Sequence, residues 1–378
     1  MNSLSKKEAE FYQRQLTLDG FGMQAQEKLK AASVLVVGAG GLGCPALQYL
    51  ASAGVGRLGV VDDDSVEISN LQRQFLYSAE DVGEPKATVA TVRLKKHNPN
   101  ISFEPLCERL NEGNIRRIFE KYDLVVDGSD NFETRYLVND ACVILGKPLV
   151  FGAIFKFNGQ ISVFNYENGP TYRCLFPEPP GVEALPSCAD AGVLGVLPGI
   201  IGSMQALEAI KIITGIGEAL SGRVLIFDAM EQKFSQLQLT PVQENQEIRK
   251  LQSIKTHKNA DCSRSSVVDE IKELSPVDLI EMRRSNPKII VIDVRESWER
   301  ELERIQPSNH IPLGSLNEAS VEQALPGSHA EEIAVYCKAG VRSMDACRLL
   351  HDLGYKKIYN LNGGMIRWHA EGMPMDID

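Results

Sequence analysis

The sequence is poor in cysteine, has fewer basic than acidic residues and contains no long hydrophobic run. Eight cysteines in 378 residues are too few for a disulfide scaffold, so each must be judged by its neighbours. The 40 basic and 50 acidic residues give a net charge of −10, which argues against a general binder of nucleic acid or of anionic membranes. The most apolar segment, residues 191–204, is too short to span a bilayer and indicates a buried helix.

The beginning of the chain also lacks the marks of a targeting signal. Its first 16 residues contain neither an apolar core nor a small-residue cleavage site, so we expect no secretory signal. We therefore expect a cytoplasmic protein whose cysteines remain free thiols. A hydrophobic content of 43% and a charged content of 24% are typical of a globular protein. At about 100–200 residues per domain, the length predicts two or three domains.

Strand and helix patterns alternate through the first half of the chain. Such alternation predicts a parallel sheet with helices on both faces. After Pro148, two strand patterns follow each other without a helix, so we expect a mixed, mainly parallel sheet. The predicted strands are residues 33–38, 57–62, 101–106, 124–127, 149–154 and 159–165, and the predicted helices are residues 44–53, 86–97 and 131–145.

A polar, weakly patterned segment at 243–266 predicts a linker. It separates a larger domain, residues 1–242, from a smaller one, residues 267–378, which is long enough to fold by itself. The predicted fold class is α/β in both, with a Rossmann-like first domain. In the second domain, strands are expected at 289–294, 332–336 and 357–360, and helices at 276–284 and 342–353.

A glycine-rich turn joins the first predicted strand to the first predicted helix. Its glycines are Gly38, Gly40, Gly41 and Gly43, and they let backbone N–H groups approach a phosphate at a helix N-terminus. Asp62 ends the next strand, where a carboxylate can hold ribose hydroxyls. On these residues alone, a dinucleotide enzyme and an ATP enzyme fit equally well, and a glycine turn without a ligand is the third interpretation.

Polar and cationic residues beyond the second strand separate these interpretations. Asn70, Arg73 and Lys86 form a cluster that a hydride-transfer site does not need, whereas a triphosphate losing pyrophosphate needs positive charge on its oxygens. Asp130 follows the strand at 124–127, at the carboxyl edge where ligands bind, and can hold Mg²⁺ against the phosphates. The cluster favours an ATP·Mg²⁺ enzyme over an NAD-dependent dehydrogenase.

These motifs resemble those of the ubiquitin-activating-enzyme type of adenylyltransferase, whose bacterial branch includes MoeB and ThiF. The resemblance covers residues 5–240 and rests on GAGGLGC, on the segment 62–74, on Lys86 and on DGSDNFETR. It implies that ATP·Mg²⁺ activates the C-terminal glycine of a small ubiquitin-fold sulfur carrier ending in Gly-Gly, as an acyl-adenylate.

The resemblance also implies roles for individual residues. Asp62 would hold the ribose, Arg73 and Lys86 would bind phosphates, and Asp130 would position Mg²⁺. Arg14 matches an arginine that reaches the ATP of the neighbouring subunit in a homodimer. By its sequence context alone, Arg14 is an ordinary charge on a helix surface.

Seven of the eight cysteines fall into three groups with different expected roles. Cys188 lies in a small-residue loop just before a helix, and a helix N-terminus lowers the pKa of a thiol. It is therefore a candidate second nucleophile, with a buried structural cysteine as the alternative. Relatives often hold structural zinc with two Cys-x-x-Cys pairs, of which only Cys174 and Cys262 remain here. Two thiolates and two hydroxyls make a poor zinc site, so we expect zinc to be absent. Core positions are expected for Cys44, Cys107, Cys142 and Cys347.

A second glycine-containing turn follows the apolar strand at 332–336. Cys337 begins this turn, Gly340 lies within it, and Arg342 and Ser343 begin a helix. The N–H groups of such a turn can form an anion nest, and Arg342, with Lys338 less certainly, adds positive charge that favours a thiolate. An inert cysteine at the end of a strand is the alternative.

Over residues 270–378 the sequence resembles a rhodanese, a sulfurtransferase that carries a persulfide. The motifs are IDVRE at 292–296, HIPLG at 310–314, which has an extra Leu313, and NGGMIRW at 362–368. The resemblance implies that Cys337 carries the persulfide and that Asp293 and Arg295 stabilise the loop. A phosphatase loop would hold one more residue between its cysteine and arginine.

Together the two resemblances imply one reaction sequence. The first domain adenylates the carrier, and Cys337, loaded by a cysteine desulfurase or thiosulfate, attacks the adenylate. A second thiol, with Cys188 the candidate, then releases a thiocarboxylate for molybdopterin or a related sulfur pathway. The expected partners include neither nucleic acid nor a membrane. The alternatives are an activator that forms a Cys188 thioester and an adenylyltransferase with a docking-only second domain.

Overall fold

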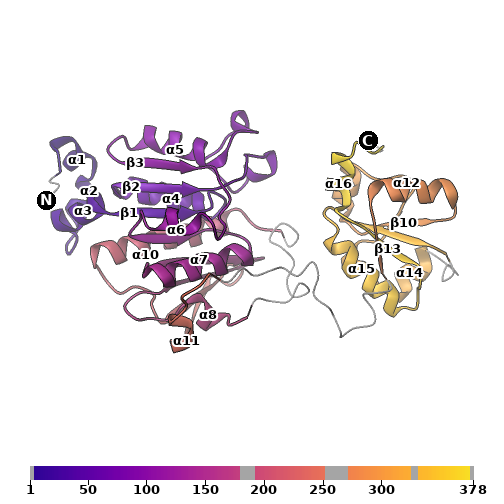
Figure 1. Ribbon diagram of the computed structural model, residues 1–378. Helices are drawn as coiled ribbons and strands as arrows, with labels where there is room; N and C mark the ends of the chain where they lie inside the picture. The colour runs from indigo at the N-terminus through magenta and orange to yellow at the C-terminus, as the bar shows by residue number, and fades with distance from the viewer. Residues whose placement is uncertain (1–3, 179–191, 252–270, 325–330, 375–378) are drawn as a thin grey trace. The chain divides into compact units, whose positions relative to one another are not determined.

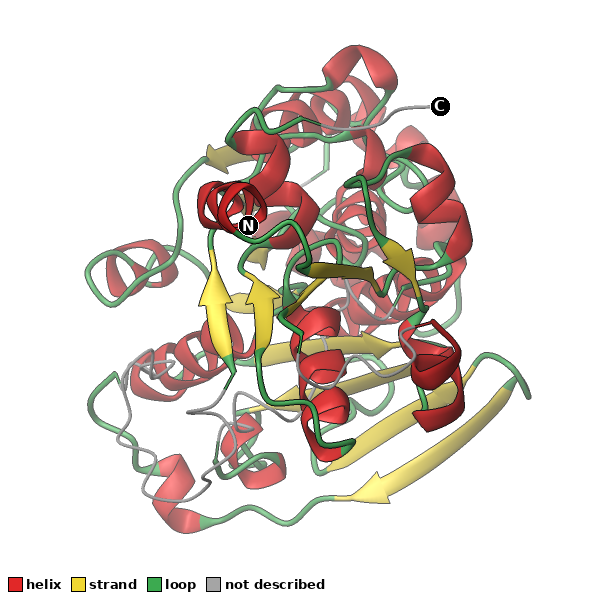
Figure 2. Cartoon of the chain, turned by 90° about the vertical axis from the view of Figure 1, so that its right-hand side faces the viewer, coloured by secondary structure: helices red, strands yellow, loops and turns green. Residues whose placement is uncertain are grey.

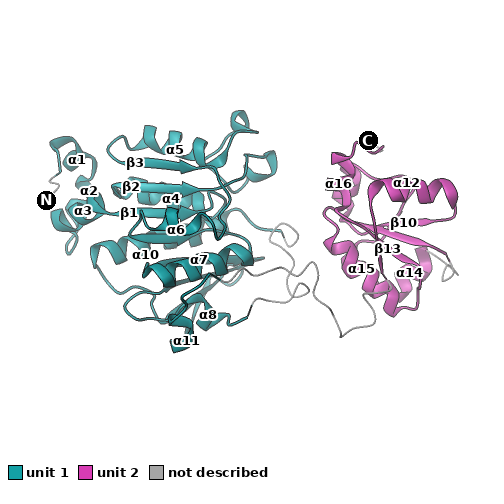
Figure 3. Cartoon of the chain, viewed as in Figure 1, with its two compact units in different colours: residues 1–258 teal, residues 259–378 magenta. Residues whose placement is uncertain are grey.

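The computed structural model describes residues 4–178, 192–251, 271–324 and 331–374 (Figure 1). The chain divides into two compact units, residues 1–258 and 259–378 (Figure 3). Both units combine helices with strands, in agreement with the predicted α/β class (Figure 2).

The first unit is built on an eight-stranded sheet in the order β3-β2-β1-β4-β5-β6-β7-β8. The first four neighbouring pairs are parallel, and the remaining three are antiparallel, so the sheet is mixed as predicted. The strands are β1 (Ser33–Val37), β2 (Arg57–Val61), β3 (Ser102–Leu106), β4 (Leu124–Asp127), β5 (Leu149–Phe155), β6 (Asn158–Phe164), β7 (Arg223–Asp228) and β8 (Lys233–Gln238).

Helices cover both faces of this sheet because its parallel strands are apolar on both sides. Val34 and Val36 of β1 face one core, formed with α4, α5 and α10, while Leu35 and Val37 face the other, formed with α6 and α7. The helices are α1 (Lys6–Phe11), α2 (Gln13–Leu16), α3 (Gly22–Ala31), α4 (Gly43–Ala53), α5 (Lys86–His97), α6 (Ile115–Phe119), α7 (Phe132–Leu145), α8 (Tyr172–Leu175), α10 (Val196–Thr214) and α11 (Gln243–Gln246), with 3-10 turns η1 (Ile68–Asn70) and η2 (Ala79–Asp81).

Among the described residues, α10 has the length and composition that a membrane span would need. It packs against α4 and against β5 and β6, and its buried residues include Leu197, Ile201 and Gln205. These contacts identify it as the buried core helix that the apolar pattern predicted.

The second unit has a smaller sheet, entirely parallel, in the order β11-β10-β12-β13-β9. Ile333 and Val335 of β12 face a core formed with α15, and Ala334 and Tyr336 face one formed with α12 and α16. The sequence did not predict β9 or β11, which are only three and two residues long. The elements are β9 (Lys272–Leu274), α12 (Pro276–Ser285), β10 (Ile290–Asp293), α13 (Ser297–Leu302), β11 (Asn309–His310), η4 (Leu313–Ser315), α14 (Glu318–Ala324), β12 (Ile333–Tyr336), α15 (Val341–Asp352), β13 (Ile358–Leu361) and α16 (Gly364–Ala370).

Three of the four cysteines expected in the core are buried there: Cys44, Cys142 and Cys347. The prediction for Cys107 is wrong, because this residue is exposed. Cys107 follows the last residue of β3, an edge strand that is only partly covered, and its Sγ lies 3.3 Å from the Thr88 hydroxyl.

Candidate active sites

The glycine turn between β1 and α4 lies against the turn that follows β4. Gly38 has a φ of +85°, and a Cβ there would lie 3.1 Å from the carbonyl oxygen of Gly128. A Cβ on Gly43 would collide with the carbonyl oxygen of Gly38. Side chains are therefore excluded at these two positions, because the backbone segments pack closely against each other there.

Asp62, directly after β2, is bonded to this turn. Its Oδ2 accepts the Ala39 N–H at 2.7 Å, and its Oδ1 accepts the Asp64 N–H at 2.9 Å. Burial raises the pKa of Asp62 despite these two N–H donors. Each carboxylate oxygen still has a second lone pair, which is the chemistry that a ribose hydroxyl requires.

Arg73 and Gln74 lie over the glycine turn. A Cβ on Gly41 would lie 3.7 Å from Arg73 Cδ, and one on Gly40 would lie 3.6 Å from Gln74 Nε2. Arg73 Nη1 donates to the Ser69 carbonyl at 2.8 Å, which leaves other guanidinium donors for an anion. The buried Gln74 Oε1 has no hydrogen-bond partner in the described part of the chain, and the sequence motif that contains this residue gave it no role of its own.

Asn70 of η1 and Lys86 of α5 are two further residues predicted for the site at the glycine turn. The Asn70 Oδ1 accepts the Glu67 N–H at 3.1 Å, so this buried amide closes η1. Lys86 is the first residue of α5, is 5% exposed and donates to Asp64 Oδ2 at 2.8 Å. Asp64 itself is exposed, so the Lys86 ammonium lies at the edge of the site.

Asp130 follows β4 at the same carboxyl edge of the sheet and is exposed. The turn before it is fixed from two sides. Asp127 Oδ1 accepts the Ser129 N–H at 2.9 Å, and Arg135 Nη2 donates to the Ser129 carbonyl at 3.0 Å. Gln205 of α10 donates to the Asp127 carbonyl at 2.6 Å. The Asp130 carboxylate therefore extends from a rigid turn, and its hard oxygens suit Mg²⁺.

Arg14 does not join this cluster within one chain. It is exposed on α2, and α1–α3 lie at the end of the sheet where β1–β3 begin (Figure 1). Its neighbour Gln15 donates to the carbonyl of Ala53, the last residue of α4, at 3.2 Å. The glycine turn is at the other end of that helix.

Cys188 and Cys262 lie outside the described residues. Cys174, at the end of α8, has a thiol whose Sγ accepts the Thr171 N–H at 3.4 Å and the Val242 N–H at 3.3 Å. Within the described ranges, no group of three or more His, Cys, Asp and Glu side chains could hold a metal ion. Cys174 thus joins α8 to the segment after β8 by hydrogen bonds.

Cys337 is buried at the base of a tight loop after β12. Its Sγ accepts the Gly340 N–H at 3.1 Å and lies 3.4 Å from the Ser343 hydroxyl. Gly340 has a φ of +93°, which favours glycine at this corner. The loop is closed from below by α16, where Met365 N–H donates to the Cys337 carbonyl at 3.0 Å. One N–H of the expected nest, that of Gly340, therefore donates to the sulfur, together with the Ser343 hydroxyl.

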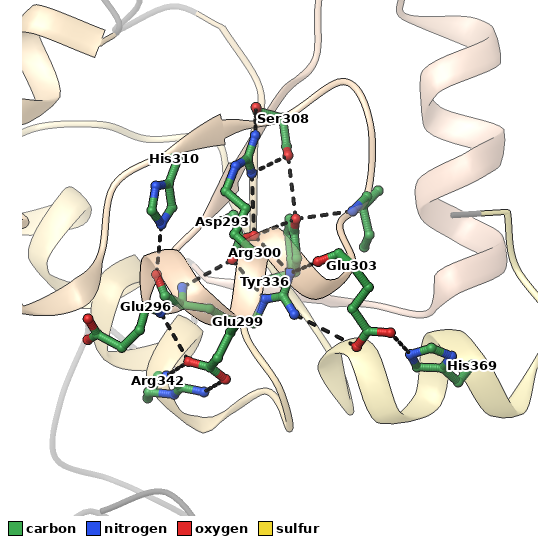
Figure 4. Close-up of polar contacts among 12 residues, drawn as sticks. Asp293, Glu296, Glu299, Arg300, Glu303, Ser308, His310, Tyr336, Arg342 and His369 are labelled. Atoms are coloured by element: carbon green, nitrogen blue, oxygen red, sulfur yellow. Dashed lines mark hydrogen bonds and ion pairs between the residues drawn. The ribbon is translucent and has the colours of Figure 1, made fainter. Parts of the chain in front are cut away.

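Arg342, whose positive charge was expected near the sulfur, forms an ion pair with Glu299. Its Nη1 and Nη2 donate to the two carboxylate oxygens of Glu299, at 2.7 and 2.8 Å (Figure 4). The opposite charge of Glu299 compensates that of Arg342, and Lys338 is exposed. Burial would raise the pKa of Glu299, but the hydrogen bonds from Arg342 and the Glu296 N–H outweigh it, so the pKa is lowered. The Gly340 N–H and the Ser343 hydroxyl are neutral donors to the sulfur, and the contribution of the Arg342 charge stays a prediction.

Asp293 and Arg295 form a buried network beneath the loop. Arg295 Nε and Nη2 donate to the Asp293 carboxylate, each at 3.0 Å, and the Tyr336 hydroxyl donates to Asp293 Oδ2 at 2.8 Å (Figure 4). Arg300 adds a further bond to Asp293 at 3.3 Å. Their placement agrees with a stabilising role, since none of these bonds reaches the Cys337 sulfur.

The chain matches the model of the ThiF family over residues 12–248 and the model of the rhodanese-like domain over residues 275–371. It is 39% identical over 378 residues to a probable adenylyltransferase/sulfurtransferase, MoeZ, of Mycobacterium tuberculosis, covering 99% of this chain and 96% of that protein. It is 58% identical over 238 residues to a sulfur carrier protein adenylyltransferase of Thermus thermophilus, covering 62% of this chain and 88% of that protein.

The match extends to eukaryotic proteins and to solved structures. The adenylyltransferase and sulfurtransferase MOCS3 of Xenopus laevis is 39% identical over 391 residues, covering 96% of this chain and 87% of that protein. The structure of E. coli MccB with AMPCPP and MccA matches in fold, with a TM-score of 0.55, 22% identity, and coverage of 64% of this chain and 73% of that one. The chain therefore belongs to the ThiF family and carries a rhodanese-like domain after its ThiF region.

Proposed function

We propose that the first unit adenylates the C-terminal carboxylate of a small sulfur-carrier protein and that Cys337 of the second unit then transfers sulfur to it. The chain is an adenylyltransferase and sulfurtransferase by its relatives. The observation that carries the assignment of Cys337 is its Sγ, held beneath a loop by the Gly340 N–H and beside the Ser343 hydroxyl. Such donors stabilise a sulfur anion.

In the adenylation step, the carrier carboxylate attacks the α-phosphorus of ATP, and pyrophosphate leaves. Asp62 holds the ribose, while Arg73 and Lys86 stabilise the charge that builds on the phosphate oxygens. Asp130 offers the carboxylate that would hold Mg²⁺, which when bound neutralises phosphate charge. Gln74, whose Nε2 would lie 3.6 Å from a Cβ on Gly40 and whose Oε1 has no partner among the described residues, is a further group for the ligand.

In the sulfur steps, the Cys337 thiolate attacks the outer sulfur of thiosulfate, the S–S bond breaks and sulfite leaves. The terminal sulfur of the persulfide attacks the carbonyl carbon of the carrier adenylate, the bond to the phosphate oxygen breaks, and AMP leaves, which gives an acyl disulfide. A second thiol attacks the Cys337 sulfur, the S–S bond breaks and the thiocarboxylate leaves. A thiol reductant then reduces the resulting disulfide, which returns both cysteines to free thiols. Cys188 is the candidate for that thiol, with molybdopterin or a related sulfur compound as the destination.

We also propose that two copies of the chain share each adenylation site. Arg14 is exposed at the opposite end of α4 from the glycine turn, so only a second copy can bring it there. Mixing Arg14→Ala and Asp130→Ala subunits tests this arrangement. One intact site per mixed dimer restores part of the ATP–pyrophosphate exchange if the site is shared, and no exchange returns if each site is built from one chain.

The expected zinc content, domain boundaries and cellular location each have a direct test. Metal analysis of the purified protein should find no tightly bound zinc, and one zinc per chain would refute this. Limited proteolysis should cut between domains at 1–242 and 267–378. Fractionation of cells should recover the protein with the cytoplasm.

The experiment for the central proposal compares wild type with Cys337→Ser in two assays. ATP–pyrophosphate exchange that requires a Gly-Gly-ending carrier should persist in both proteins. Thiocyanate formation from thiosulfate and cyanide should disappear in Cys337→Ser. Exchange without any carrier requirement, or thiocyanate formation by the variant, would overturn the proposal.

A further inference from the structure

A polar chain runs from the buried Ser343 hydroxyl, beside Cys337, to Asn360 and Glu273, two residues that the proposed mechanism does not use. Ser343 of α15 has its Oγ 3.4 Å from Cys337 Sγ and 2.6 Å from Asn360 Oδ1. Asn360, on β13, donates through Nδ2 to the Gly340 carbonyl and to Glu273 Oε1, both at 3.1 Å. Cys337, Ser343 and Asn360 are 0%, 0% and 2% exposed, so water does not compete for these bonds.

The orientation of the Asn360 amide follows from its partners. The Gly340 carbonyl and the Glu273 carboxylate can only accept hydrogen bonds, so the atom that faces both must be the amide nitrogen. The atom that faces Ser343 is then the amide oxygen, which can only accept. Asn360 also pairs with Glu273 in the parallel ladder of β13 and β9, which holds its backbone in place.

Ser343 has one hydroxyl hydrogen for two acceptors. While Cys337 is a thiol, its S–H can donate to the Ser343 oxygen, and the Ser343 hydroxyl donates to Asn360. When Cys337 becomes a thiolate, the hydroxyl hydrogen can turn to the sulfur anion. In both states the Ser343 oxygen has to stay beside the sulfur.

The hydrogen bond to Asn360 keeps the Ser343 hydroxyl beside the sulfur. A serine hydroxyl in a helix can instead donate to the backbone carbonyl three or four positions before it, which for Ser343 is that of Gly340 or Ala339. The 2.6 Å bond to Asn360 holds Ser343 away from that alternative. We propose that Asn360 is a positioning residue for sulfur transfer, which holds the Ser343 hydroxyl against Cys337 so that it stabilises the thiolate formed when sulfur leaves.

This inference rests on the proposed role of Cys337, and its test separates the two. The full chain is assayed with thiosulfate and cyanide, and kcat/KM for thiosulfate is measured across pH. Ser343→Ala should lower kcat/KM at pH 7 by about 10-fold and raise the pH of half-maximal kcat/KM by about one unit, since one hydrogen bond to a charged group is lost. Ser343→Thr, which keeps the hydroxyl, should retain the wild-type pH midpoint.

Asn360→Ala should shift the pH midpoint in the same direction, and the double variant should be no worse than Ser343→Ala alone. Ser285→Ala, which removes an exposed hydroxyl from α12, is the matched control and should change nothing. If Asn360→Ala does not fold, as its melting curve would show, the Ser343→Ala and Ser343→Thr pair still decides the role of the hydroxyl.

Two results would overturn the inference while leaving the proposed function intact. One is an unchanged pH midpoint in Ser343→Ala with normal thiocyanate formation. The other is an Asn360→Ala effect that adds in full to that of Ser343→Ala, because Asn360 would then act independently. A wild-type protein that forms no more thiocyanate than Cys337→Ser would instead refute the role of Cys337 itself.

Discussion

The glycine turn of the first unit and the cysteine loop of the second occupy equivalent places in their sheets. They differ in the exposure and hydrogen bonding of the polar groups around them. Each follows a buried parallel strand, contains a positive-φ glycine and leads into a helix. Around the glycine turn, Asp130 is exposed and Gln74 Oε1 is unpartnered. Around Cys337, the neighbouring Ser343 and Asn360 are buried and hydrogen-bonded.

This difference follows from what reacts at each site. A site for a charged, dissociable ligand keeps polar groups available, because the ligand supplies their partners. A site that carries its own reactive atom has to stabilise that atom in advance, and its donors are already in place. The two reactions should therefore be separable by substitution.

The largest expected effect is that of Cys337→Ser, which should sharpen this separation. It removes the nucleophile, so thiocyanate formation should fall by about 10³-fold or more. ATP–pyrophosphate exchange should stay within about twofold, because the substitution is confined to the second unit. A large parallel loss of exchange would show that the units do not act independently.

Lys86→Ala should impair the reaction of the first unit and leave that of the second unit unchanged. Loss of the ammonium from the phosphate site should lower ATP–pyrophosphate exchange by about 10²–10³-fold and leave thiocyanate formation intact. Lys96→Ala removes the same group from the exposed end of α5 and serves as the control. Equal losses in the two variants would contradict the role given to Lys86.

The third prediction concerns the buried ion pairs that support each unit. Asp293→Ala leaves the Arg295 guanidinium buried without its carboxylate and should lower the free energy of unfolding of the second unit by about 3–5 kcal/mol. Asp140→Ala should do the same to the first unit, where Arg173 donates to Asp140 at 2.7 and 2.8 Å. Differential scanning calorimetry should show only one shifted transition in each variant, and a shift of both would contradict independent units.

The smallest effect is expected from the Glu299–Arg342 pair, through its dependence on pH. The pKa of Glu299 is lowered in the folded state, so the unfolded state binds its proton more readily. The pair therefore stabilises the second unit above the unfolded pKa, and this stabilisation is lost as pH falls through the folded pKa. Glu299→Gln should lower the free energy of unfolding of the second unit by about 1–2 kcal/mol at pH 7. The variant should also lose less stability than the wild type as pH falls, as measured by urea unfolding at several pH values. An unchanged pH dependence would show that the pair contributes nothing.

Local motifs made the two turns predictable. Gly38, Asp62 and Cys337 stand next to apolar strands in the sequence, so their positions at sheet edges followed from the strand pattern alone. The edge strands β9 and β11 were missed because three and two residues carry no periodicity.

Hydrogen-bond partners were not predictable, because they are distant in sequence. Arg342 and Glu299 are 43 positions apart, so nothing local indicated that the arginine pairs with this carboxylate. Ser343 and Asn360 meet only after α15 packs against β13. Cys107 was assigned to the core because it adjoins a strand, although the strand is at the edge of its sheet.

The most direct test of the account joins both sites in one reaction. The full chain is incubated with ATP, Mg²⁺, thiosulfate, a thiol reductant and a sulfur-carrier protein ending in Gly-Gly, and the intact carrier is weighed by mass spectrometry. The account predicts that the carrier exchanges one oxygen for one sulfur, and that neither Cys337→Ser nor a reaction without ATP produces this change. A carrier of unchanged mass with every Gly-Gly-ending candidate, or sulfur transfer that persists in Cys337→Ser, would contradict it.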